Sequence, residues 1–114
     1  KVIKTMDGYF VLAGNAKYYG MLFQLTHRAN LTDGMLDVLV MKQMRLVDII
    51  RCLFGGTVKS HQLCKQVYYK KMKKIRVKTK GKTPVLIHVD CEMTGRTPAT
   101  VEICPKALNL VCCE

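Results

Sequence analysis

The sequence lacks any run of about 18 consecutive apolar residues, so we expect no transmembrane helix. It also lacks a secretory signal peptide and an initiator methionine, and we therefore expect the chain to be a piece of a longer protein. Acidic residues are few, with 8 Asp and Glu against 19 Lys and Arg, which gives a net charge of +11. An excess of this size predicts an anionic partner, such as phospholipid headgroups, nucleic acid or an acidic protein.

Several motifs that mark self-contained chemistry are missing. There is no Gly-rich phosphate loop, no H-E-x-x-H zinc motif and no Ser, His and Asp pattern of a hydrolase triad. The six cysteines include no C-x-x-C pair, and Cys112 and Cys113 are adjacent, so we expect neither a zinc site nor a disulfide framework. Cysteines inside apolar patterns act as small hydrophobic residues, and a reducing, cytosolic setting is the simpler interpretation.

The stretch from Ala29 to Met41 joins two local signals. Asp33-Gly34 is a strong turn pair, because Gly34 can adopt a positive φ and the Asp33 side chain can bond to nearby backbone. Residues 35–41 then alternate with a period of two and are apolar enough to be covered on both faces, which predicts a buried strand. A carboxylate held in this turn could bind a cation or brace the turn, and the pattern alone favours bracing.

The remaining pattern is mainly β. We expect a hairpin formed by Val2–Met6 and Tyr9–Ala13, and one helix at Leu46–Phe54, where the apolar residues form a single stripe. Further strands are predicted at residues 21–26, 66–69, 74–80, 85–89, 99–103 and 108–112, with a loop over 93–98. We expect residues 1–114 to form a single domain, an antiparallel β-sandwich or barrel with one helix.

Basic residues concentrate between Lys59 and Lys82, where ten Lys or Arg occur without an acid. Near the end of this segment they alternate with apolar or small residues, which predicts a strand with one apolar and one basic face. The basic face consists of Lys74, Arg76, Lys78 and Lys80. It is a candidate contact for an anionic surface, and a solvated strand face fits the same pattern.

Asp90 and Glu92 follow the predicted strand 85–89. In extended backbone, residues two apart point to the same face, so the two carboxylates would lie close together. Such closeness raises one pKa, and a shared Mg²⁺ would relieve the repulsion. That arrangement suits phosphoryl transfer, while an acidic turn in solvent fits the spacing as well.

Taken together, the motifs resemble the C-terminal part of the diacylglycerol kinase and sphingosine kinase family of lipid kinases. The similarity extends over nearly all of the chain, and it depends on the order and spacing of motifs that are each weak alone. In order they are N-x-x-x-x-G at 15–20, A-x-x-x-D-G-x-L-D-V at 29–38, an apolar helix ending in Gly-Gly, V-D-C-E at 89–92 and I-C-P-K-A-L at 103–108.

The resemblance implies a two-domain lipid kinase that phosphorylates a lipid hydroxyl with ATP and Mg²⁺. It implies that this chain is the C-terminal β-sandwich that shapes the lipid site, and that ATP is bound mainly by an N-terminal domain with a G-G-D-G-T motif, which is absent here. Glu92 would be a general base or part of the Mg²⁺ network, supported by Asp90. Asp33 would hold a structural Mg²⁺ with the main-chain carbonyls of Asn30 and Met35.

The same resemblance predicts a cytoplasmic protein, peripheral at an anionic membrane, that is inactive without its nucleotide-binding half. Cys91 departs from the family pattern, which has Gly at this position, and a positive φ there would strain it. The resemblance also implies that the opening strands of the sandwich are absent from this chain, and because exposed edges pair with other chains, we expect a homodimer or higher assembly of the isolated fragment. The alternatives are a non-catalytic basic β-domain that binds nucleic acid or anionic membrane, and a structural relative that lost catalysis.

Overall fold

The computed structural model describes residues 4–18, 25–43, 45, 47, 67–109 and 111. Within these residues the protein is built from strands, and every strand pair is antiparallel. The strands are β1 (Phe10–Gly14), β2 (Leu36–Met41), β3 (Val67–Met72), β4 (Lys74–Val77), β5 (Leu86–Val89), β6 (Glu92–Arg96) and β7 (Ala99–Glu102). The prediction of a mainly β, antiparallel fold is confirmed.

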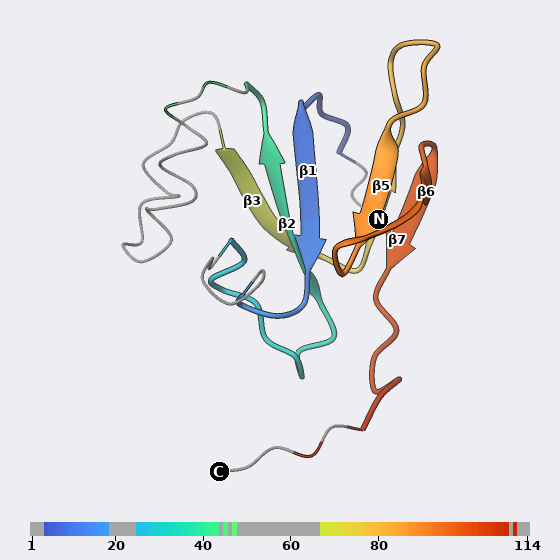
Figure 1. Ribbon diagram of the computed structural model, residues 1–114. Coiled ribbons are helices and arrows are strands. Elements are labelled where there is room, and N and C mark those ends of the chain that lie inside the picture. The colour runs from blue at the N-terminus through green and yellow to red at the C-terminus, as the bar shows by residue number, and fades with distance from the viewer. Residues whose placement is uncertain are drawn as a thin grey trace.

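Strand β2 is the centre of a three-stranded sheet with the order β1-β2-β3 (Figure 1). Gly14 of β1 and Lys71 of β3 lie opposite Asp37 of β2, one on each side. Every residue of β2 is buried. This confirms the predicted strand covered on both faces, as expected of an almost uninterrupted apolar sequence.

The two faces of β2 support two separate clusters. On one face Leu36, Val38 and Val40 pack against Ile75 of β4 and Val101 of β7. Strands β4 and β7 pair with each other rather than with the three-stranded sheet, so they form a second layer over it. This packing of sheet on sheet gives the molecule its sandwich-like character.

The opposite face of β2 carries Leu39 and Met41. These side chains pack against Leu12, Leu25 and Tyr69, which come from β1, from the turn at 25–28 and from β3. The neighbouring position on this face is Asp37, whose side chain is fully buried. A carboxylate is therefore buried in β2, the strand that carries both apolar clusters.

Strands β5 and β6 form a hairpin that Figure 1 shows beside the main sheet. Val89 pairs with Glu92, which leaves Asp90 and Cys91 as a two-residue turn with φ angles of 49° and 69°. The predicted loop over 93–98 is wrong, because residues 92–96 are strand β6. The sequence predicts a turn at Thr94-Gly95 within this loop, but both residues lie in β6, which is exposed along its whole length.

The predicted N-terminal hairpin is also wrong in its described part. Residues 4–8 form no strand, and β1 pairs with β2 instead. The Tyr9 N–H donates to the Met41 carbonyl at 2.8 Å, and Gly8 lies against Val40 and Met41 where a side chain would not fit. Gly8 therefore serves close packing on β2 rather than a local turn.

Other predicted elements differ or fall outside the description. Residues 107–109 and 111 form no strand, and Leu25 and Thr26 lie in a turn. The predicted helix, apart from Val47, and residues 21–24 lie outside the described residues. In the described part of the chain, no helix has the length and apolar character needed to cross a membrane.

Replacing Cys91 by glycine should stabilise the domain. Both turn residues have positive φ, as in a type I′ turn, and a non-glycine residue in this conformation costs roughly 1–2 kcal/mol. We expect Cys91→Gly to raise the free energy of unfolding by about 1 kcal/mol, measured by urea denaturation followed by circular dichroism.

The matched control is Cys104→Gly, because Cys104 is also exposed but has no positive φ. Glycine there should lower stability, since it only adds freedom to the unfolded chain. Equal losses in both variants would show that the turn does not have this conformation.

Candidate functional site

The Asp33-Gly34 turn has the geometry that its sequence predicts. Gly34 adopts a φ of 65°, and Asp33 Oδ1 accepts a hydrogen bond from the Met35 N–H at 2.9 Å. Just upstream, Asn30 Oδ1 accepts hydrogen bonds from the N–H and the hydroxyl of Thr32 at 2.9 and 2.8 Å. Both side chains thus brace their own loop before the chain enters β2.

A lysine that the sequence did not single out joins this turn to the sheet. Lys71 Nζ lies 2.5 Å from Asp33 Oδ2 and 3.0 Å from Asp37 Oδ2. The hydrogen bond from Lys71 is the main cause that lowers the pKa of Asp33; desolvation opposes it, and the Met35 N–H lowers the pKa further by a smaller amount. Conversely, the bond to Asp33 raises the pKa of Lys71, with help from Asp37. Each group therefore favours the charged form of the other.

The buried carboxylate of Asp37 has a second donor. The Tyr69 hydroxyl donates to Asp37 Oδ1 at 2.5 Å, and it accepts a hydrogen bond from the Arg28 N–H at 3.3 Å. Burial raises the pKa of Tyr69 above its usual value, and the bond to Asp37 raises it further. Tyr69 therefore stays protonated and can serve as a permanent donor to the carboxylate.

This arrangement does not fit a structural Mg²⁺ at Asp33. Both oxygens of that carboxylate already accept hydrogen bonds, one of them from an ammonium group at 2.5 Å. Mg²⁺ requires oxygen ligands in close octahedral contact, and an ammonium in the same place excludes it. Among the described residues, no group of three or more His, Cys, Asp or Glu is placed to hold a metal ion.

The candidate catalytic acids lie elsewhere, at the tip of the β5–β6 hairpin. Asp90 is in the turn, Glu92 opens β6, and both are exposed. The prediction that they share a face rested on extended backbone and is wrong in that respect, because the φ angles of Asp90 and Cys91 are positive. Neither carboxylate forms an ion pair with another residue in the described part of the chain.

The alternation predicted for the basic strand is present in β4. Lys74 and Arg76 are exposed, whereas Ile75 and Val77 are half-buried. The Lys74 ammonium lies 2.7 Å from Glu102 on the paired strand β7. Farther along, Lys80 Nζ lies 2.6 Å from Asp7. Two of the four predicted surface cations are therefore neutralised by nearby acids.

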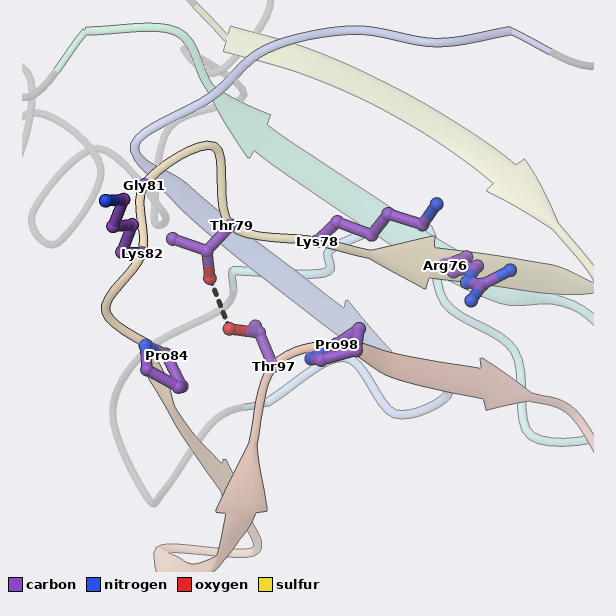
Figure 2. A pocket seen from close by; sticks show the side chains of 8 residues that line it. All are labelled: Arg76, Lys78, Thr79, Gly81, Lys82, Pro84, Thr97 and Pro98. Atoms are coloured by element: carbon purple, nitrogen blue, oxygen red, sulfur yellow. Dashed lines mark hydrogen bonds between the residues drawn. The ribbon is translucent and has the colours of Figure 1, made fainter.

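The other two predicted cations border a hollow of about 380 Å³ beside the β4–β7 pair. Figure 2 shows Arg76 and Lys78 along one side of it and Lys82 at the far end. Between them the Thr79 and Thr97 hydroxyls bond to each other, and the Val85 N–H donates to Thr97 Oγ1 at 2.9 Å. Lys82 was not among the predicted contact residues, and only its place at the end of the basic segment could have suggested it.

Replacing Tyr69 by phenylalanine should destabilise the domain. The change removes one donor from a fully buried carboxylate, and a hydrogen bond to a charged group contributes about 1.5–3 kcal/mol. We expect a loss of that size in the free energy of unfolding, measured by urea denaturation. Tyr68→Phe, on the opposite face of the same strand, is the control and should change stability little; similar results for both variants would contradict the role of the Tyr69 hydroxyl.

Comparison with known families adds an independent result. The family model described as "YegS C-terminal NAD kinase beta sandwich-like domain" matches residues 2–112, which is nearly the whole chain. No curated protein matches the chain. The turn at Asp33, the sandwich around β2 and the exposed acidic hairpin all lie within the matched range. The chain therefore belongs to this family, the C-terminal β-sandwich domain of the YegS-like lipid kinases, which is the diacylglycerol and sphingosine kinase group.

Proposed function

We propose that the chain is the lipid-site half of an ATP- and magnesium-dependent kinase of the diacylglycerol or sphingosine type, which phosphorylates a lipid hydroxyl at an anionic membrane surface. Its family supports the general reaction. The pairing of the acidic residues supports Asp90 and Glu92 as the catalytic residues. The described part of the chain contains six acidic residues, and four of them, Asp7, Asp33, Asp37 and Glu102, are paired with lysines. Only Asp90 and Glu92 remain available for chemistry among the described acids.

In the proposed reaction Glu92 accepts the proton of the lipid hydroxyl. The hydroxyl oxygen then attacks the γ-phosphorus of ATP, and the bond from that phosphorus to the bridging oxygen breaks to leave ADP. Asp90, the turn residue two positions before Glu92, would keep the local potential negative and help to hold the magnesium that accompanies the nucleotide. That magnesium would supply charge neutralisation, which together with positioning of the reactants provides most of the catalysis in phosphoryl transfer. The nucleotide itself is assigned to the N-terminal half of the kinase.

Replacing Glu92 by glutamine tests this assignment. A positioned general base contributes roughly 10²–10⁴-fold, so Glu92→Gln should lower kcat/KM by a factor in that range. The measurement is transfer of labelled phosphate from ATP to diacylglycerol or sphingosine in vesicles by the full-length protein.

The matched control is Glu102→Gln, which removes an exposed carboxylate that is already paired with Lys74. It should leave the rate nearly unchanged. If Glu92→Gln is as active as the wild type, the assignment of Glu92 is wrong. If the wild type labels no lipid, the proposed reaction is wrong.

The basic face supports the membrane part of the proposal. Arg76, Lys78 and Lys82 surround the hollow and form no ion pair with another described residue. Basic residues near an anionic bilayer each contribute about 1 kcal/mol of attraction. Three of them together are enough to bias this face of the domain toward the bilayer.

Neutralising the three cations should weaken membrane binding. The triple variant Arg76→Gln, Lys78→Gln, Lys82→Gln should bind phosphatidylserine vesicles roughly 100-fold less tightly than the wild type, measured by co-sedimentation of the full-length protein.

A second triple variant, Lys17→Gln, Lys42→Gln, Lys106→Gln, loses the same charge outside the hollow and is the control. Its binding should fall much less. Binding that is indifferent to salt and to anionic lipid, or equal losses in the two triple variants, would contradict a role for this face.

A further inference from the structure

We infer that Lys71 supplies an internal cation that ties the Asp33 turn to the buried Asp37, using the same Asp33 carboxylate for which the family resemblance implies a divalent metal ion. The contact of Asp33 and Asp37 with Lys71 is called the junction below. The chain would then hold the junction with its own side chain, and the stability of the domain would not depend on magnesium. This inference goes beyond the proposed function. It concerns contacts within the described residues and does not depend on whether the protein phosphorylates a lipid.

The hydrogen-bond network around the two carboxylates has a donor at every oxygen. The four oxygens of the two carboxylates each accept a hydrogen bond. Asp33 Oδ1 accepts from the Met35 N–H at 2.9 Å and Asp37 Oδ1 from the Tyr69 hydroxyl at 2.5 Å. The other two oxygens face the same ammonium, at 2.5 and 3.0 Å. Each carboxylate oxygen therefore already has a donor, and among the described residues Lys71 is the only cation that meets both carboxylates.

The register of β2 against β3 also places Lys71 beside Asp37. Lys71 lies directly opposite Asp37 in the antiparallel pair of β2 and β3, so the two side chains stand on the same face. The turn at Gly34 brings Asp33 back over that face, within reach of the same ammonium. The position of the cation is therefore fixed by three backbone elements and not by a flexible surface contact.

The charges of Asp33 and Asp37 also require a cation nearby. The Asp37 side chain has no exposed surface, whereas the side chains of Asp33 and Lys71 are 28% and 33% exposed, so one of the two negative charges is fully buried. A buried charge that loses its partner is strongly destabilising, so this junction requires a cation. A divalent ion and the ammonium cannot occupy it together, because they would repel one another at close range. Lys71 and a divalent metal ion are therefore alternative sources of the positive charge between Asp33 and Asp37, and this chain uses Lys71.

The test compares the wild type with Lys71→Met, which keeps the length of the side chain and removes the charge. The readout is the thermal unfolding midpoint of the full-length protein without nucleotide, in EDTA and in increasing MgCl₂, with NaCl of matched ionic strength. We expect the wild-type midpoint to be the same in EDTA and in magnesium. Lys71→Met should unfold roughly 10 °C lower in EDTA and recover part of this loss in MgCl₂ but not in NaCl.

Two further variants make the result specific. Lys74→Met removes the exposed pair with Glu102 and should hardly change the midpoint, because such surface pairs contribute little. The double variant Lys71→Met, Asp33→Asn lacks the second carboxylate and should not respond to magnesium. If Lys71→Met does not fold in EDTA, recovery of its circular dichroism spectrum in MgCl₂ is the equivalent result.

Three outcomes would overturn the inference. One is a saturable stabilisation of the wild type by magnesium, which would show that the junction binds the metal despite the lysine. Another is a Lys71→Met midpoint equal to that of the wild type, which would show that no cation is needed. The third is a Lys71→Met variant that magnesium does not restore, which would show that ammonium and metal do not share one place. Failure of the proposed kinase activity would leave all three measurements unaffected.

Discussion

Burial of a carboxylate inside a strand that is covered on both faces is the constraint on which the structure depends. Strand β2 supports one cluster on each face: the β4–β7 layer packs on one face, and residues of β1, β3 and the turn at 25–28 pack on the other. Asp37 interrupts its apolar sequence and can be buried only with donors around it. Tyr69 and Lys71 provide those donors from β3, and in doing so they fix the register of β2 against β3.

The parts of the fold that the sequence predicted have local causes. The turn at Asp33-Gly34 follows from a glycine that accepts a positive φ and a carboxylate that bonds two residues ahead. The burial of β2 follows from its high content of apolar residues. The basic face of β4 follows from the alternation of basic and apolar residues along the strand. Each of these signals is contained within a few neighbouring residues, so it can be read without knowledge of the partner strand.

The parts that the sequence did not predict depend on distant pairing. Strand β1 pairs with β2 across more than twenty intervening residues, whereas the sequence suggested a local hairpin with residues 2–6. The role of Lys71 follows from its position opposite Asp37, and no single-strand pattern reveals a register. At the β5–β6 turn the sequence left an extended acidic pair and a turn open as alternatives. The structure has the turn, with positive φ at Asp90 and Cys91, although cysteine is a poor residue for this conformation.

The charged residues fall into two groups, those that form ion pairs within the domain and those that do not. Ion pairs with acidic residues are formed by Lys71, Lys74 and Lys80. The cations around the hollow and the two acids at the hairpin tip are not used in this way by the described residues. Charges that a fold does not use for itself cost little to present to a partner, because no internal pair must be broken. The net charge alone therefore does not indicate which face would bind an anionic partner, whereas the cations without an ion pair mark the face that we propose.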